Sequence, residues 1–332
     1  MTNKHILITG ASGFIGSFLV EEALGRGFQT TAGIRKTSSR QYLQDPRINL
    51  LELNFADKQK LKEQLLQAGK FDYIIHNAGL TKTCRPEEFD QVNYQNTRNF
   101  IEALQENNQV PEKFIFISSL EAYGPGKPGT TEPIKVTDTP HPATKYGKSK
   151  LKAEKFIYGQ KDFPWLIMRP TGVYGPREKD YYLVFKSIKQ GIETYIGREP
   201  QHLTFIYVKD LSRLLIDMLL SDVIQRSYFG SDLNQYTSRE FNALIKKYLD
   251  KKTLKIILPK SLVKLLAFVN EKLSCLVGKT PTLNSDKYFI ISQNNWLCDS
   301  SNLVTDFDFQ PHYDLKKGVK ETMDWYLDNQ WL

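Results

Sequence analysis

The stretch that decides the fold class is residues 5–16, which read HILITGASGFIG. Its apolar first half, His5–Thr9, predicts a buried β-strand, and the apolar positions from 13 to 26 predict a helix that follows at once. Glycines in the intervening turn let the backbone bend tightly, approach a phosphate and pack helix against strand. The free N–H groups at the helix start would then face a pyrophosphate. The residues we assign to this cofactor turn are Gly10, Ser12, Gly13, Phe14, Ile15 and Gly16.

Short apolar runs and helical patterns alternate from this stretch onward. Further strands are expected at 30–34, 48–53, 73–76, 114–118 and 166–169, and helices at 58–67, 86–107 and 146–158. Buried runs separated by helices predict right-handed βαβ units, and hence an α/β fold with a doubly wound parallel sheet of the Rossmann type.

The second half of the chain is less regular. A strand is expected at 204–208, a helix at 209–220, a strand at 227–230, and helices at 238–249, 259–277 and 314–327. We expect a dinucleotide-binding domain at 1–168, to which 204–220 returns. The remainder of 169–332 would form mainly a smaller C-terminal substrate lobe.

Composition excludes several classes of protein. The chain has 332 residues, of which 40% are hydrophobic and 25% charged, so it is not disordered. The net charge is +8, but there is no run of five like charges and no zinc-finger or RNA-binding signature, so nucleic acid is not an expected partner. No apolar run reaches the roughly 18 residues of a transmembrane helix, and no signal peptide precedes the first strand. Cys84, Cys275 and Cys298 share no metal-ligand spacing, which favours a reduced cytoplasmic protein without a metal site.

The end of the second predicted strand bears on the choice of cofactor. An NAD site usually carries an acidic residue there for the ribose 2′-hydroxyl. Here the chain has Ile34 followed by Arg35, Lys36 and, two residues later, Ser38, with no acid. These cations and the hydroxyl suit a 2′-phosphate, so NADP is preferred over NAD. The alternative is that both cations are simply solvated.

A tyrosine and a lysine four residues apart predict acid–base chemistry. Tyr146 and Lys150 share one helix face, and a nearby lysine is expected to lower the pKa of a tyrosine. Such a phenol can protonate a ketone or deprotonate an alcohol. Ser118 and Ser119 follow the fifth strand, where ligands bind in parallel sheets, so a serine there can donate to the reacting oxygen or merely cap the strand end.

The ordered set GASGFIG, HNAG, VNYQNT, ISSLEAYG, YGKSK and RPTGVYGP resembles the extended short-chain dehydrogenases/reductases, also called the NAD-dependent epimerase/dehydratase family. The resemblance is strong over 4–220 and loose beyond. It implies that Tyr146 is the catalytic tyrosine and that Lys150 binds the nicotinamide ribose. It also implies that Ser119 polarises the substrate carbonyl and that Asn93 supports the site.

The same resemblance assigns further cofactor residues. Asn77, Ala78 and Gly79 match the backbone around the adenosine and its phosphates, and Pro170, Thr171 and Val173 match the strand end that lines the nicotinamide. Asn54 and Phe55 align with an Asp–aliphatic pair at the adenine, where the asparagine is a departure. Family members often form homodimers through two long helices, which would be 86–107 and 146–158 here.

The substrate side departs from the nucleotide-sugar members. Their phosphate-gripping arginine falls at Leu203, and their asparagine falls at Thr171, although Arg177 or Arg198 could replace them. The dehydratase members carry two acids before the tyrosine pair, of which only Glu121 is retained. Glu121 is therefore either a second acid/base or an ordinary loop carboxylate.

RPTGVYGP and LTFIYV instead look like the hydroxysteroid-dehydrogenase and flavonol-reductase side of the family. The leading hypothesis is an NADP(H)-dependent ketone reductase or alcohol dehydrogenase for a sterol- or lipid-like substrate. The alternatives are a nucleotide-sugar epimerase, dehydratase or reductase, and a non-catalytic NADP-binding regulator. An apolar stripe from Leu262 to Val277, with lysines around it, is either lobe core, a lid, or a peripheral contact with lipid.

Overall fold

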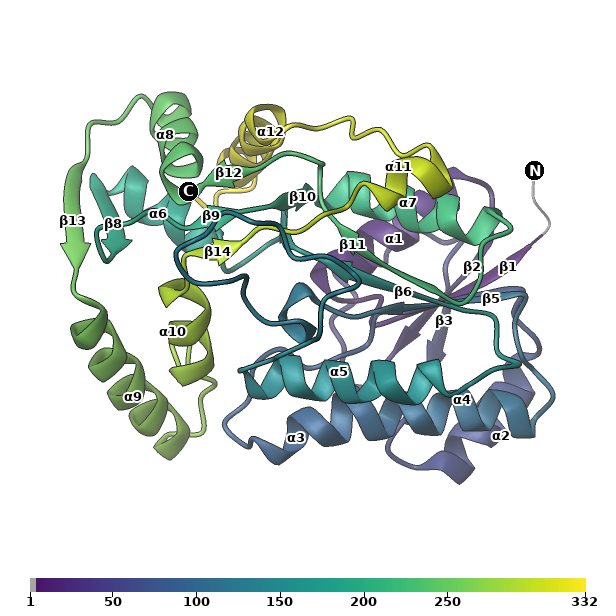
Figure 1. Cartoon of the computed structure of the whole chain (residues 1–332). Coiled ribbons are helices and arrows are strands. Elements are labelled where there is room, and N and C mark those ends of the chain that lie inside the picture. The colour runs from purple at the N-terminus through teal and green to yellow at the C-terminus, as the bar shows by residue number, and fades with distance from the viewer. Residues whose placement is uncertain (1–3) are drawn as a thin grey trace.

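A seven-stranded parallel sheet forms the centre of the computed structural model, which describes residues 4–332 (Figure 1). Its strand order is β11-β6-β5-β4-β1-β2-β3, so the chain starts in the middle and winds outward in both directions. The doubly wound Rossmann fold expected from the apolar runs is confirmed. The strands are β1 (His5–Thr9), β2 (Gln29–Ile34), β3 (Asn49–Glu52), β4 (Tyr73–His76), β5 (Lys113–Ile117), β6 (Trp165–Pro170) and β11 (Arg226–Gly230).

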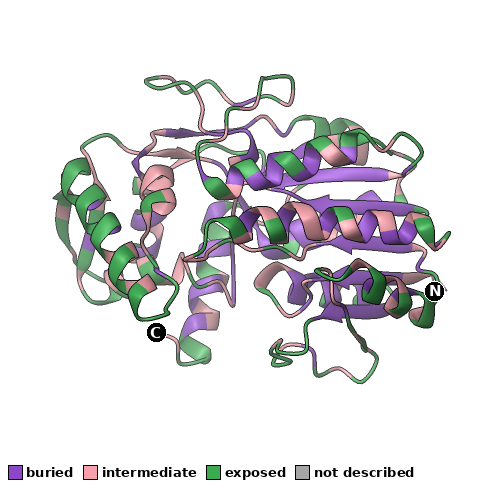
Figure 2. Cartoon of the chain, turned by 90° about the horizontal axis from the view of Figure 1, so that it is seen from below, coloured by how far each residue is buried: buried purple, intermediate pink, exposed green. Residues whose placement is uncertain are grey.

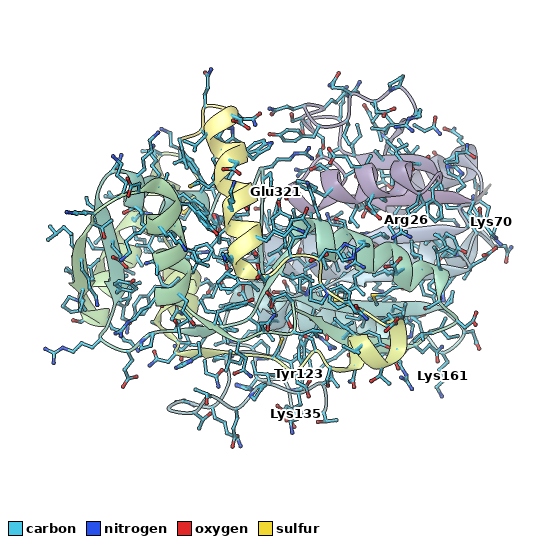
Figure 3. All side chains as sticks on the ribbon, turned by 90° about the horizontal axis from the view of Figure 1, so that it is seen from above. Arg26, Lys70, Tyr123, Lys135, Lys161 and Glu321 are labelled. Carbon is cyan, nitrogen blue, oxygen red and sulfur yellow. A yellow bond between two sulfur atoms is a disulfide. The ribbon has the colours of Figure 1, made fainter. Side chains whose placement is uncertain are left out.

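Helices cover both faces of this sheet. On one face α1 (Phe14–Gly25) and α7 (Val208–Leu220) share a core with β1 and β2. On the other face lie α2 (Lys58–Ala68), α4 (Asn96–Glu106) and α5 (Lys145–Tyr158). Viewed from below, the central strands are buried while the outer faces of the helices are exposed (Figure 2). At the end of α1, Arg26 pairs with Asp217 of α7 at 3.0 Å, which ties the two helices together (Figure 3).

Two segments differ from expectation within this half. The single helix expected at 86–107 is interrupted: α3 (Glu87–Asp90) passes through a π-helical turn (Gln91–Gln95) into α4. Segment 204–220 returns to the Rossmann half only as α7. Its strand, β10 (Phe205–Tyr207), pairs with β7 (Gly172–Tyr174) in a separate two-stranded sheet. The seventh strand of the main sheet is β11. It lies beyond residue 168, where the dinucleotide-binding domain was expected to end.

The lobe has its own aromatic core, built around Tyr174, Phe185, Phe205, Phe241 and Tyr326. Several of its elements lacked a clear sequence pattern. The lobe and its connections comprise α6 (Tyr182–Lys189), β8 (Ile192–Ile196), β9 (His202–Leu203), β12 (Tyr236–Thr237), α8 (Ser238–Leu249), β13 (Leu254–Leu258), α9 (Lys260–Leu276), α10 (Ser285–Ser292), β14 (Asn295–Trp296), α11 (Asn302–Phe307) and α12 (Leu315–Asp328). Of these, α11 packs back against the Rossmann core through Leu303.

The expectation of three free thiols is wrong. Cys84, before α3, and Cys275, near the end of α9, form a disulfide with a Cα–Cα distance of 5.5 Å, and Cys298 is a free, buried thiol. The two bonded residues are 191 positions apart, so only the tertiary fold brings them together. Among residues 4–332, no helix is long and apolar enough to cross a membrane. Within the same range, no group of His, Cys, Asp and Glu side chains is placed to hold a metal ion.

Candidate active site

The predicted site residues follow the carboxyl ends of six neighbouring strands. Because the strands are parallel, these ends meet at one edge of the sheet, where ligands bind in such folds. The glycine turn follows β1, Arg35 follows β2, Asn54 follows β3, Asn77 follows β4 and Ser118 follows β5, while Pro170 ends β6. The alternation of strands and helices thus brings together residues that are far apart in the sequence.

The glycine turn is shaped for close backbone approach. Gly10 has a φ of +65°, and a Cβ there would lie 2.8 Å from the Ala78 nitrogen. A Cβ on Gly16 would lie 2.1 Å from the Gly10 carbonyl oxygen. Gly13 precedes α1 and no side chain caps the helix, so its first N–H groups are available to a ligand. This cradle fits the pyrophosphate of a dinucleotide.

Next to the turn is a hollow of about 170 Å³ lined by nine of the predicted residues. It gathers the tyrosine, the lysine and the serine beside the strand end expected to face a nicotinamide. The predicted residues that line it are Ile15, Asn77, Gly79, Ser119, Tyr146, Lys150, Pro170, Thr171 and Val173. Ile117, Ser118 and Thr81 complete the wall. The hollow therefore has the residues and the position required for the reactive end of the cofactor.

Tyr146 and Lys150 lie on the first turns of α5, as their spacing predicted. The helix is fixed to the sheet because Arg169 of β6 donates two hydrogen bonds of 2.9 Å to Glu154, and both side chains are fully buried. Lys150 donates to the Ile117 carbonyl at 2.7 Å, and burial lowers its pKa to about 8. The Lys150 Nζ also lies 4.6 Å from the centre of the Phe116 ring.

The expected lowering of the Tyr146 pKa is not what the structure shows. Burial raises the pKa of Tyr146, the charge of Glu121 raises it further, and the Ser119 hydroxyl opposes the increase. The buried lysine turns its ammonium group toward a backbone carbonyl instead. With a raised pKa the phenol carries its proton near neutral pH, so Tyr146 is in the protonated form that a proton donor requires.

Asn93 connects three parts of the site. It lies in the π-helical turn, is fully buried, and donates to the Leu80 carbonyl at 2.9 Å and to Ser149 of α5 at 3.0 Å. Its oxygen accepts the Leu80 N–H at 2.7 Å. The turn thus directs Asn93 at the loop after β4 and at α5, which is the arrangement expected of a residue that supports the site.

Glu121 is held inside the fold, unlike a freely solvated loop carboxylate. It accepts a hydrogen bond of 2.9 Å from Thr144, whose oxygen caps α5 by accepting the Gly147 N–H at 2.9 Å. Burial raises the pKa of Glu121 to about 7, while Thr144 and the charge of Lys287 lower it in part. Its carboxyl group can therefore exist in either protonation state near neutral pH.

The residues expected near the adenosine lie farther along the sheet edge. Arg35 and Lys36 are exposed, and the Arg35 N–H donates to the Ser38 hydroxyl oxygen at 3.0 Å, which leaves the Ser38 hydrogen free to donate. Within residues 4–332, Arg35 and Lys36 form no ion pair, so their charge is available to a 2′-phosphate. Asn54 donates its backbone N–H to Gln64 at 2.9 Å. The Phe55 ring packs 5.2 Å from Phe100, so a contact between that ring and adenine stays a prediction.

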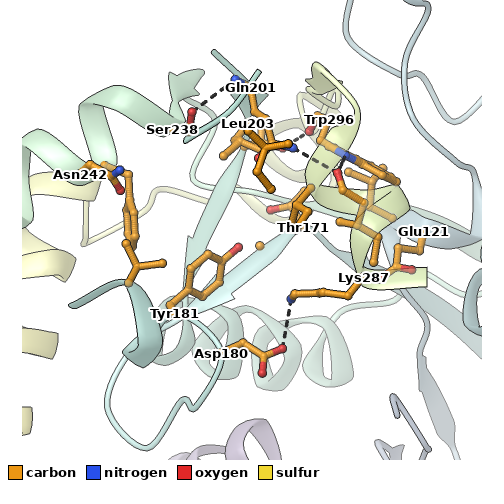
Figure 4. Close-up of a pocket in the computed structure, with 18 of the residues that line it drawn as sticks. Glu121, Thr171, Asp180, Tyr181, Gln201, Leu203, Ser238, Asn242, Lys287 and Trp296 are labelled. Atoms are coloured by element: carbon orange, nitrogen blue, oxygen red, sulfur yellow. Dashed lines mark hydrogen bonds and ion pairs between the residues drawn. The ribbon is translucent and has the colours of Figure 1, made fainter. Parts of the chain in front are cut away.

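A larger cavity of about 410 Å³ opens beyond Ser119 and extends into the lobe (Figure 4). Most of the surface exposed inside it is apolar, although about half of the lining residues are polar or charged. The lining includes Leu203, where the resemblance placed the phosphate-gripping arginine. The charged residues on the wall are Glu121, Asp180, Glu199 and Lys287. The single cation, Lys287, is paired with Asp180 at 3.2 Å, and Lys82 also contacts that carboxylate. Of the three carboxylates, Glu121 was a predicted site residue, whereas Asp180 and Glu199 were not predicted from the sequence.

Neither candidate phosphate ligand lines this cavity. Arg177 donates to Ser17 at 2.8 Å and to Glu21 at 2.6 Å on α1, and its guanidinium lies 4.3 Å from the Phe18 ring centre. It therefore joins the lobe to the Rossmann half. Arg198 is exposed, and its carbonyl accepts a hydrogen bond of 2.6 Å from Arg239.

Several residues of the site were missed from sequence. Thr144 gives a signal, because a threonine directly before a helical pattern is a typical N-cap. Tyr181, Gln201, Lys287 and Trp296 converge on the cavity from four separate segments (Figure 4). No local pattern marks these residues, since their meeting depends on how the lobe packs.

Comparison with known proteins places the chain in a family. The sequence pattern described as "NAD dependent epimerase/dehydratase family" matches residues 6–228. An Escherichia coli O157:H7 protein named N-acetyl-alpha-D-glucosaminyl-diphospho-ditrans,octacis-undecaprenol 4-epimerase is 27% identical over 97% of this chain and 95% of its own. The 3 beta-hydroxysteroid dehydrogenase/Delta 5-->4-isomerase of Vaccinia virus is 26% identical over 97% of this chain and 99% of its own. The crystal structure of dTDP-glucose 4,6-dehydratase from Bacillus anthracis in complex with NAD matches with a TM-score of 0.77. The match covers 99% of this chain and 98% of that chain, with 18% sequence identity.

The chain belongs to the NAD dependent epimerase/dehydratase family. It is an enzyme of this family, which argues against the alternative of a non-catalytic regulator. The Gly10 cradle, the uncapped start of α1 and the hollow at Tyr146 fit a nicotinamide dinucleotide.

Proposed function

We propose that this protein is an NADP(H)-dependent reductase or dehydrogenase that interconverts a ketone and an alcohol on an apolar, sterol- or long-chain-lipid-like substrate. The observation that carries the proposal is the charge of the cavity beyond Ser119. Its wall is mainly apolar and holds three carboxylates against one paired lysine.

This charge pattern opposes a nucleoside diphosphate. A buried diphosphate needs cations or hydrogen-bond donors, because an unpaired buried charge is very costly. Here the phosphates would approach Glu121, Asp180 and Glu199, and Lys287 would have to leave Asp180 to meet them. An apolar substrate instead gains about 25 cal/mol for each Å² it buries. The wall therefore favours hydrocarbon with a few polar groups.

The chain supplies acid–base chemistry at the junction of cavity and hollow. Ser119 would donate a hydrogen bond to the carbonyl oxygen, and Tyr146 would give that oxygen its proton. Lys150, which lines the same hollow, would bind the nicotinamide ribose, and the glycine turn and Arg35 would hold the pyrophosphate and the 2′-phosphate. When bound, the nicotinamide supplies hydride exchange with the carbonyl carbon.

The names of two relatives include a lipid, and one of these names also includes a sugar diphosphate, which fits the sugar-epimerase alternative equally well. The Vaccinia virus protein is named for a steroid, and the Escherichia coli protein for a sugar joined through a diphosphate to undecaprenol. The NADP preference rests on Arg35 and Lys36, whereas the Bacillus anthracis enzyme is described with NAD. A homodimer through segments 86–107 and 146–158 and a cytoplasmic location remain predictions, and the Cys84–Cys275 disulfide removes the argument that reduced cysteines gave for that location.

The test is a thermal-shift screen with NADPH present, using hydrophobic ketones in one arm and UDP-, dTDP- and GDP-sugars in the other. Ketones should raise the melting temperature and oxidise NADPH, and nucleotide sugars should do neither. Stabilisation by a nucleotide sugar, with none by any ketone, would reverse the assignment.

The second candidate is a nucleotide-sugar epimerase or dehydratase, and Glu121 favours it. A carboxyl group with a pKa of about 7 beside Tyr146 provides the second acid/base that an elimination requires. Loss of turnover on a nucleotide sugar in Glu121→Gln, with binding retained, would support this candidate.

A further inference from the structure

Helix α9 stands at the outer end of the lobe and is attached along one side only (Figure 1). On its inner side Val263 and Ala267 are buried, and Asn270 donates to the Leu283 carbonyl at 2.7 Å. The Cys84–Cys275 disulfide fixes its far end to the Rossmann half. The helix is therefore held firmly in place while its outer side faces away from the protein.

That outer side is apolar, which reverses the pattern of an ordinary surface helix. Between 42% and 82% of each large apolar side chain on it is accessible to solvent. At 100° per residue, all but Phe268 fall within one arc of about 120° that contains no charged residue. The exposed residues are Leu262, Leu265, Leu266, Phe268, Val269, Leu273, Leu276 and Val277. The apolar stripe seen in the sequence is thus mostly surface and only in small part core.

The segment that carries this apolar arc is strongly cationic. Within α9, Lys272 lies about 20° from one edge of the arc, whereas Lys260 and Lys264 lie on the opposite side of the helix. The segment from 251 to 279 contains seven lysines and a single acid, Glu271, which is occupied by a hydrogen bond from the Ser285 N–H at 2.9 Å. All seven lysines are exposed. They are Lys251, Lys252, Lys255, Lys260, Lys264, Lys272 and Lys279. A second copy of the chain fits this face poorly, because pairing would bring two sets of cations together without acids between them.

We propose that α9 is an interfacial helix that docks the protein on an anionic lipid bilayer. Its apolar arc would lie at the boundary of headgroups and acyl chains, and the lysines would meet the lipid phosphates. The exposed apolar arc and the excess of lysines over acids in residues 251–279 are both complementary to such a surface.

Helix α9 is connected to the substrate cavity through two neighbouring elements. Helix α10, which packs against α9, contributes Ile290 and Ile291 to the cavity wall. Strand β13 leads into α9 and pairs with β8, which contributes Tyr195 and Ile196. Docking would thus bring the substrate cavity close to the bilayer. The docking itself does not depend on the proposed function, because it is measured without substrate.

The experiment is flotation of the full-length protein with two kinds of vesicle, phosphatidylcholine alone and phosphatidylcholine mixed equally with phosphatidylglycerol. Wild type should float with the mixed vesicles and dissociate at high salt. Leu273→Glu should weaken partitioning by on the order of tenfold, and Leu273→Glu with Leu276→Glu should abolish it. The matched control is Leu66→Glu on α2, since Leu66 and Leu273 are each 59% exposed.

Circular dichroism, melting temperature and NADPH titration establish that each variant is folded. Flotation that is lost only in the α9 variants supports the proposal. No flotation of the wild type, or equal flotation of wild type and the double variant, overturns it. A concentration-dependent dimer that dissociates in the α9 variants, without lipid binding, would also overturn it and identify the face as an interface between two copies.

Discussion

Thr144 donates its hydroxyl hydrogen to Glu121 across 2.9 Å, and its oxygen accepts the Gly147 N–H at the start of α5. One side chain therefore caps the catalytic helix and holds a carboxyl group beside Tyr146. Close packing makes this arrangement possible, because a Cβ on Gly147 would lie 2.2 Å from the Glu121 carbonyl oxygen. The pKa of about 7 at Glu121 is a consequence of this packing.

That pKa predicts how stability depends on pH. An unfolded glutamate titrates near pH 4.3, so between about pH 4.3 and 7 the folded protein keeps a proton that the unfolded chain has lost. Stability should fall as pH rises through this window, by up to about 3 kcal/mol. Glu121→Gln should lack this loss, and should exceed wild type in the free energy of unfolding above pH 7 but not near pH 4.

Urea unfolding across this pH range measures the difference. Glu199→Gln is the control, since Glu199 lines the same cavity but is exposed. Parallel pH curves for wild type and Glu121→Gln would contradict the assigned pKa.

Tyr146 is expected to be the proton donor. Tyr146→Phe removes only the hydroxyl group, so turnover should fall by about 100- to 10,000-fold while NADPH affinity stays within about twofold. Steady-state kinetics on any accepted ketone and a fluorescence titration of NADPH measure the two effects. Tyr248→Phe, in α8 of the lobe, should keep wild-type turnover. The assignment fails if Tyr146→Phe retains most of its activity.

Arg35 is expected to set the preference for NADPH over NADH. A charge-assisted hydrogen bond to the 2′-phosphate contributes about 1.5–3 kcal/mol, which is roughly ten- to hundredfold in affinity. Arg35→Ala should lose this preference without weakening NADH binding. Arg47→Ala, whose exposed arginine pairs with Asp45 at 2.6 Å, should not change it. Tighter binding of NADH than NADPH by wild type would refute the role of Arg35.

Gly10 is expected to tolerate no side chain. Its φ of +65° and the 2.8 Å approach of Ala78 mean that Gly10→Ala should lower the melting temperature and weaken NADPH binding at least tenfold. Gly25→Ala is the matched change, because a Cβ there meets no atom within 4 Å and the residue ends α1. It should raise stability by up to about 1 kcal/mol. Similar behaviour of the two variants would show that the turn is less constrained than its geometry indicates.

The sequence determines the Rossmann half because local patterns there agree with the final fold. A buried strand such as Tyr73–His76 is a short apolar run in any context, and the glycine turn needs its residue type at Gly10 whatever surrounds it. The spacing of Tyr146 and Lys150 places both on one helix face for the same reason. Most of the residues that line the hollow could therefore be predicted from the sequence and from the family resemblance.

Only the tertiary structure decides the features that depend on distant packing. Burial and the charge of Glu121 raise the pKa of Tyr146, whereas the Lys150 ammonium that was expected to lower it donates to the Ile117 carbonyl instead. No local pattern predicts which distant segments meet in the Cys84–Cys275 bond, in the ion pair of Lys287 with Asp180, or in the pairing of β11 with the main sheet. Likewise, periodicity shows that α9 has an apolar side, but only its place at the outer end of the lobe leaves most of that side exposed.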